Sequence, residues 1–183
     1  VPRPSKKEEK MIAYLKAFGA KHNLETKVDE AGNVLIKKPA TPGKENLQTV
    51  VLQSHIDMVC EKNNDVQHDF LTDPIETEID GEWLKAKGTT LGADNGIGVA
   101  TELAILADDS IEHGPLECLF TVDEETGLTG AFALQEGFMS GDILLNLDSE
   151  DEGEIFIGCA GGIDSVAEFT YKEVEGSAGY FFF

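Results

Sequence analysis

Residues 89–109, TTLGADNGIGVATELAILADD, join a glycine-rich turn to a run of apolar residues at helical spacing, which predicts a helix over 97–109. The turn is no phosphate-binding loop, because Val99 and Ala100 follow its last glycine where lysine and a hydroxyl residue are needed. The glycine spacing also differs from the dinucleotide-binding pattern. Two interpretations remain: a plain turn, or backbone free of side chains that lets Asp94 approach something closely.

Strands and helices alternate around this helix. The pattern predicts a helix over 4–23, a hairpin over 24–38, a buried strand over 49–55, a strand running into a turn over 115–127, a short helix over 129–138 and two strands around an acidic turn over 142–158. Residues 60–82 read as an acidic loop. This alternation predicts an α/β fold with a mixed, largely parallel sheet flanked by helices.

The first predicted helix has a clear start and a clear apolar face. Ser5 and Glu8 have the spacing of a capping box. The apolar face consists of Met11, Ile12, Leu15 and Phe18.

The chain is strongly acidic, with 35 acidic residues against 14 basic ones and a formal net charge of −21. Such a surface repels phosphate backbones, so nucleic acid is not expected as a partner. The sequence contains no run of about eighteen apolar residues, so no membrane-spanning helix is predicted. The surplus carboxylates either form a solvated face or, where they converge, attract a cation.

The cysteines, Cys60, Cys118 and Cys159, are widely spaced, and no CxxC pair occurs. This pattern indicates neither a disulfide framework nor a thiolate zinc site. We expect small buried side chains in a reducing compartment, and hence a cytoplasmic protein. The chain begins at Val1 and ends in an apolar stretch at 179–183 that reads as a strand, so we expect a fragment with an unpaired edge.

Ionisable residues follow every predicted strand: His55 and Asp57 the first, Asp123 to Glu125 the next and Asp148 the last, while Asp94 opens the helix. Sites in α/β sheets form beyond strand ends. One histidine with several carboxylates suits zinc, manganese or cobalt. Each motif alone is also common in solvated turns, so the prediction depends on their joint occurrence.

Within these motifs the residues can divide the work. His55 and Asp57 are two apart and project to one side of an extended chain, so Asp57 can accept a hydrogen bond from the ring of His55. Adjacent Glu124 and Glu125 cannot easily serve one metal together. One can be a ligand and the other a base.

Four segments resemble, in order, the motifs of the aminoacyl-histidine dipeptidases, carnosinase-like cytosolic enzymes of the di-zinc aminoacylase/carboxypeptidase group: LQSHIDMVCEKN, KGTTLGADNGIGVA, FTVDEETGLTGA and LLNLDSEDEGEIFIGCAGG. The resemblance implies hydrolysis of dipeptides, including Xaa-His, by a metal-activated water in a homodimeric enzyme with two zinc ions. Manganese or cobalt can replace zinc in such a site.

The resemblance also implies a role for each motif residue. His55 and Asp148 would be terminal ligands of one zinc, and Asp94 would bridge both ions, with a cis peptide to Asn95. Asp57 would orient His55. Glu124 would be the general base, and Glu125 would be a ligand of the second zinc.

The family's second zinc also needs a histidine from beyond a lid domain, and neither is found here. His22, His68 and His113 do not match that motif. We therefore expect residues 1–160 to be the N-terminal part of the catalytic domain, 161–183 to begin the lid, and this chain alone to be inactive. Two alternatives are an N-acyl amino acid deacylase with the same metal centre and a non-catalytic acidic cation-binding module.

Overall fold

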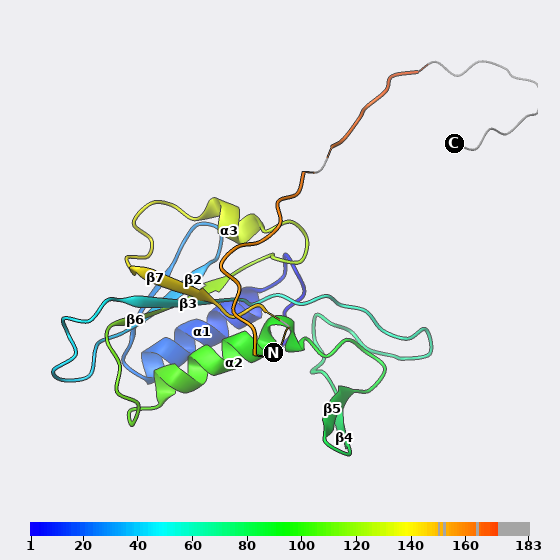
Figure 1. Cartoon of the computed structure of the whole chain (residues 1–183). Helices are drawn as coiled ribbons and strands as arrows, with labels where there is room; N and C mark the ends of the chain where they lie inside the picture. Colours follow the sequence, from blue (N-terminus) through cyan, green and yellow to red (C-terminus); the bar gives the residue numbers. More distant parts are fainter. Residues whose placement is uncertain (150, 152, 164, 172–183) are drawn as a thin grey trace, which may run out of the picture. The chain divides into compact units, whose positions relative to one another are not determined.

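The computed structural model describes residues 1–149, 151, 153–163 and 165–171. The chain divides into two units, residues 1–150 and 151–183. Every helix and strand of the described residues lies in the first unit (Figure 1).

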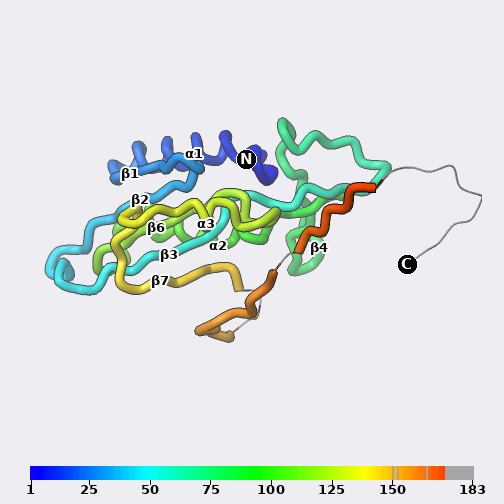
Figure 2. The backbone as a smooth tube through the Cα atoms, turned by 90° about the horizontal axis from the view of Figure 1, so that it is seen from above, coloured from blue at the N-terminus to red at the C-terminus, as the bar shows by residue number. Residues whose placement is uncertain are grey.

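The main sheet has five strands in the order β1-β2-β6-β3-β7 (Figure 2). Their bounds are β1 Glu25–Val28, β2 Val34–Lys38, β3 Val50–His55, β6 Leu116–Thr121 and β7 Ile143–Asn146. The pairings of β1 with β2 and of β2 with β6 are antiparallel, whereas β3 pairs in parallel with both β6 and β7. The mixed α/β sheet expected from the sequence is therefore confirmed.

Helices cover both faces of this sheet. The helices α1 Glu9–Lys21 and α2 Ala93–Ala107 lie on one face, and the short helix α3 Thr129–Ala133 lies on the other (Figure 1). Under α1 and α2 the buried residues include Leu15, Phe120 and Leu106. All six residues of β6 are buried because this strand is central and covered on both faces.

The expected face of the first helix is confirmed, but its capping box is not. Met11 and Leu15 are buried in the core. Glu8 instead accepts hydrogen bonds from Lys6 N–H and from Asp123 N–H, both at 3.0 Å. Ser5 donates to the distant carboxylate of Asp57, so the reciprocal bonds of a capping box between Ser5 and Glu8 are replaced by other partners.

A small second sheet begins within residues 60–82, the segment that was expected to be loop, and continues beyond it. It is the hairpin of β4 Thr77–Asp80 and β5 Trp83–Ala86. The turn contains Gly81 at φ 64°. The Asp80-Gly81 pair between alternating residues is a hairpin signal that the loop assignment missed.

The prediction of a strand after the acidic turn, at 153–158, is wrong. Residues 153–158 have no strand hydrogen bonds, and the side chains of Ile155 and Ile157 are fully exposed. An apolar alternation forms a strand only where a neighbouring strand supplies ladder hydrogen bonds. The expected edge strand at 179–183 lies outside the described residues.

The expectation of three buried cysteines holds only for Cys118. Cys60 is half-buried and Cys159 is exposed. Cys118 alone lies within a central strand. No helix among the described residues is long and apolar enough to cross a membrane.

The topology explains where a site can form. Because β6, β3 and β7 are parallel neighbours, their carboxyl ends meet at one edge of the sheet. His55 ends β3, Asp123 to Glu125 follow β6 closely, and Asp148 follows β7.

Candidate metal centre

His55 is the buried centre of a cluster of carboxylates. Its Nε2 lies 2.9 Å from Asp94 Oδ1, 3.6 Å from Asp148 Oδ1 and 4.0 Å from Glu124 Oε2. Burial lowers the pKa of the ring, but Asp57, Asp94 and Asp148 outweigh burial and raise the pKa of His55 to about 9. The imidazole therefore supplies the positive charge around which the carboxylates gather.

Asp57 fixes the other side of this ring. Its Oδ1 lies 3.2 Å from His55 Nδ1, an ion pair by distance that departs from regular hydrogen-bond geometry. The same carboxylate accepts hydrogen bonds from Glu124 N–H at 3.0 Å, Glu125 N–H at 3.2 Å and Ser5 Oγ–H at 2.7 Å. Burial raises the pKa of Asp57, but the contacts with His55, the Glu124 N–H and Ser5 outweigh it and lower the pKa to about 2.

The glycine-rich turn carries Asp94 to His55. The Asp94–Asn95 peptide is cis, as expected. Gly92 has φ 73°, and a Cβ there would lie 2.7 Å from Met58 Sδ. A Cβ on Gly98 would lie 1.9 Å from Asn95 Oδ1. The glycines thus leave room for the side chains beneath the turn, which excludes a plain surface turn.

Asn95 connects this turn to the strand β7. Its side-chain Nδ2 donates to the carbonyl of Leu147 at 2.9 Å and to the carboxylate of Asp148. Asn95 is buried, whereas the side chain of Asp94 is 53% exposed. Asp94 and Asp148 therefore reach His55 from two segments that one amide side chain holds together.

Glu124 and Glu125 lie at the end of β6 with different partners. Burial raises the pKa of Glu124; Asp148 and Glu125 add to this increase, and His55 opposes it. Burial also raises the pKa of Glu125, with the charge of Asp94 as the next cause. Both side chains are half-buried, so they can contact a ligand as well as the cluster.

This donor set fits a divalent cation. Ligand atoms of His55, Asp94 and Asp148 lie within 4.8 Å of one another, and the same holds for His55, Glu124 and Glu125. Burial raises the pKa of Asp148, and the charge of Asp94 raises it further. Asn95 and His55 lower it, but by less. The carboxylates repel one another, and a bound cation would relieve this repulsion. Carboxylate oxygens together with an imidazole nitrogen are the ligands that zinc and similar ions take.

The remaining histidines lie apart from this cluster. His22 stacks against Phe18 in the first helix, His68 contacts Phe70, and His113 Nδ1 is 2.7 Å from the carbonyl of Gly114. None of the three belongs to a group of metal-binding side chains in the described ranges.

The sequence reasoning missed side chains that lie around the cluster. Arg3, Ser5 and Glu8 contact its segments from the start of the chain, and Asn95 bonds to Asp148. A signal existed for Asn95, because the amide directly follows Asp94. Arg3, Ser5 and Glu8 gave no such signal, since their contacts span 52 to 115 positions.

The match to known families agrees with this arrangement of fold and cluster. Residues 51–176 match the description Peptidase family M20/M25/M40. This chain belongs to that family.

Two relatives are similar over most of the chain. The cytosol non-specific dipeptidase of Escherichia coli (strain K12) is 53% identical over 180 residues, which are 98% of this chain and 37% of the relative. The crystal structure of aminoacylhistidine dipeptidase from Vibrio alginolyticus is 59% identical, with a TM-score of 0.81 over 84% of this chain and 31% of that one.

A more distant relative shares the fold. Aminopeptidase PepT from Bacillus cereus is 28% identical, with a TM-score of 0.69 over 82% of this chain and 40% of that one. The chain thus spans between 31% and 40% of the lengths of these three relatives.

Proposed function

We propose that this chain is the N-terminal part of a metal-dependent dipeptidase that hydrolyses unblocked dipeptides, including Xaa-His. The observation that carries the proposal is the cluster around His55, in which four segments supply one imidazole and four carboxylates. The names of the Escherichia coli and Vibrio relatives support dipeptides as the substrate class.

In this proposal, residues 1–160 belong to the catalytic domain and 161–183 begin the lid. His55, Asp94 and Asp148 hold one zinc ion. Asp94 and Glu125, with an imidazole from outside this chain, hold the second. Zinc is the metal we expect, and manganese or cobalt would suit the same ligands. A bound ion lowers the pKa of adjacent water and stabilises negative charge developing on the peptide carbonyl.

The chain's own residues then have separate tasks. Glu124 accepts the proton of the attacking water at a carboxylate oxygen and delivers it to the leaving amine. Its raised pKa favours that task, because a general base works best with a pKa close to the working pH. Asp57 keeps the ring of His55 oriented, with Nε2 directed at the carboxylates.

Location and assembly are also proposals. We propose a cytoplasmic protein, which is supported by the word cytosol in the name of the Escherichia coli relative. The homodimer implied by the family resemblance stays a prediction, and sedimentation of the full-length protein tests it.

Hydrolysis by the full-length protein tests the proposed function. A panel of Xaa-His dipeptides, other dipeptides and N-acyl amino acids is assayed after chelation and again after zinc is restored. We expect zinc-dependent cleavage of free dipeptides. Cleavage of N-acyl amino acids alone would favour the deacylase, and metal binding without any hydrolysis would favour the cation-binding module.

A further inference from the structure

The segment 3–8 runs past the cluster and contacts three of the segments that build it. The carbonyl of Arg3 accepts a hydrogen bond from Met58 N–H at 3.2 Å, and Pro4 forms a parallel bridge with Met58. The start of the chain is thereby attached to the residues that directly follow His55 and Asp57.

Arg3 joins two of these segments. Its guanidinium donates to the carbonyls of Ile56 at 3.0 Å and Asp57 at 2.5 Å, and also to the carbonyl of Gly92. A Cβ on Gly92 would lie 2.7 Å from Arg3 Nη2, so the glycine makes room for the guanidinium. One side chain therefore sets the spacing between the end of β3 and the turn that carries Asp94.

Ser5 acts on the carboxylate that faces His55. Its hydroxyl donates to Asp57 Oδ2 at 2.7 Å, while Asp57 Oδ1 lies 3.2 Å from His55 Nδ1. Asp57 is fully buried, and each of its oxygens also accepts an N–H from the Glu124–Glu125 segment. Loss of the hydroxyl would leave a buried charge with one donor fewer and freer to rotate.

Glu8 holds the third segment. Its buried carboxylate accepts the N–H of Asp123, the residue before Glu124, at 3.0 Å. Asp123 has φ 50°, in the left-handed region that aspartate adopts more readily than most residues other than glycine.

We propose that Arg3, Ser5 and Glu8 form an N-terminal clamp of positioning residues, with Ser5 orienting the Asp57 carboxylate and, through it, His55. The expected change in kcat rests on the proposed function, whereas the orientation of Asp57 and His55 rests only on the contacts described above. None of the three residues needs to touch substrate.

The test compares Ser5→Ala, Ser5→Thr and wild type in the full-length protein. We expect Ser5→Ala to weaken zinc affinity and lower kcat by about tenfold with little change in KM, as for loss of a group that orients a ligand. Ser5→Thr keeps the hydroxyl and should return both values close to wild type. Arg3→Met should lower the same two values, because both attached segments lose their link.

Ser110→Ala is the matched control. The hydroxyl of Ser110 donates to the carboxylate of Asp108 at 2.6 Å on an exposed loop. The substitution therefore removes the same kind of hydrogen bond at a place away from the cluster. It should leave zinc affinity and kcat unchanged. If Ser5→Ala does not fold, Ser5→Cys replaces it, since a thiol keeps the size but is a weak donor.

A direct readout of orientation keeps this proposal separate from the proposed function. The Nδ1–H signal of His55 in the proton NMR spectrum of the metal-free protein should shift in Ser5→Ala and stay in Ser5→Thr. Equal spectra and equal zinc affinity in Ser5→Ala and wild type would overturn the clamp, as would an equal loss in Ser5→Thr. Absence of hydrolysis by wild type would overturn the proposed function. The NMR signal and the zinc affinity would still decide whether the clamp exists.

Discussion

His55 Nε2 lies 2.9 Å from Asp94 Oδ1, although 39 positions separate the two residues. The contact depends on the glycine-rich turn, because Gly92 and Gly98 leave the space that brings the Asp94 backbone to the end of β3. It also fixes what the imidazole can do: one ring nitrogen faces Asp57, and the other faces the carboxylates.

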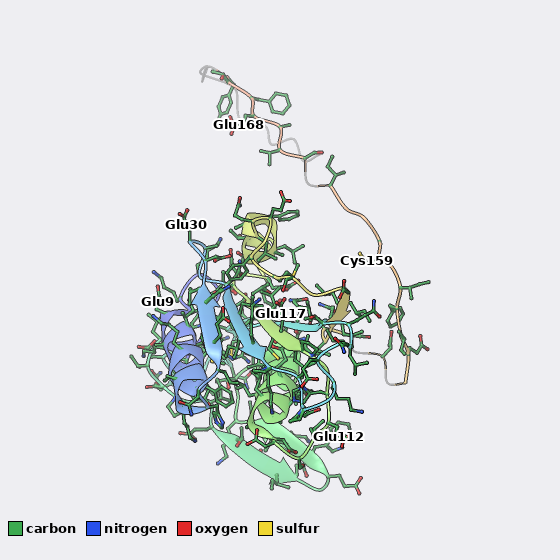
Figure 3. All side chains as sticks on the ribbon, turned by 90° about the vertical axis from the view of Figure 1, so that its left-hand side faces the viewer. Glu9, Glu30, Glu112, Glu117, Cys159 and Glu168 are labelled. Carbon is green, nitrogen blue, oxygen red and sulfur yellow. The ribbon has the colours of Figure 1, made fainter. Side chains whose placement is uncertain are left out.

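Glu124→Gln should remove hydrolysis while metal stays bound. A neutral amide cannot accept the proton of the water, so we expect kcat of the full-length protein to fall by about 10²- to 10⁴-fold with unchanged zinc content. Glu30→Gln is the control, because Glu30 is exposed at the periphery (Figure 3). Near wild-type turnover in Glu124→Gln would remove Glu124 from the role of base.

Asp57→Asn should act on the ring of His55 and on the Glu124–Glu125 segment together. The amide keeps the size of the side chain but loses its charge, so we expect zinc affinity and kcat to fall by about 10- to 100-fold. Equilibrium dialysis and steady-state kinetics measure the two effects. An unchanged affinity for zinc would show that Asp57 does not orient a ligand.

Zinc binding at neutral pH should release about one proton from His55. The pKa of the metal-free ring is about 9, so the ring is protonated at pH 7 and must lose this proton to become a ligand. Calorimetric titration in buffers with different ionisation enthalpies counts the protons. A binding enthalpy that is independent of the buffer would contradict His55 as a ligand.

Glu117→Gln should destabilise the fold without touching the cluster. Glu117 Oε1 lies 2.6 Å from Lys37 Nζ, and its other oxygen accepts the N–H of Ser140 at 2.7 Å. Its side chain is only 3% exposed. We expect a loss of about 2 kcal/mol in the free energy of unfolding at pH 7.

The pH dependence of this loss has a definite sign. Burial raises the pKa of Glu117, but Lys37 and Ser140 outweigh burial and lower it below 4.5. The stabilisation is therefore present above pH 4.5 and disappears as pH falls through the lowered pKa. Urea unfolding should show a smaller difference between variant and wild type at pH 3 than at pH 7, and Glu112→Gln, on an exposed side chain, should show little difference at either pH. An equal difference at both pH values would contradict this assignment.

The periodic elements could be predicted from the sequence because their signals are local. The helix over 97–109 and the strand over 49–55 show in their apolar spacing. The observed strand begins one residue later, and the observed helix begins four residues earlier and ends two residues earlier. The hairpin at 77–86 was missed although a glycine, Gly81, follows Asp80 at the turn. The strand expected at 153–158 was wrong, since its pattern is local whereas pairing is not.

The cluster was predictable only in part for the same reason. Parallel neighbouring strands bring His55, Glu124 and Asp148 to one edge, and this follows from the order of motifs along the chain. The contacts of Ser5 and Glu8 do not follow from local pattern. Both have the spacing of a helix cap, and their observed partners, Asp57 and Asp123, lie 52 and 115 positions away.

Anomalous diffraction at the zinc absorption edge from crystals of the full-length protein grown with zinc tests the central claim most directly. We predict one peak bounded by His55 Nε2, Asp94 and Asp148, and a second beside Asp94 and Glu125. Peaks located away from these side chains, or none in crystals of protein that hydrolyses dipeptides, would contradict the account.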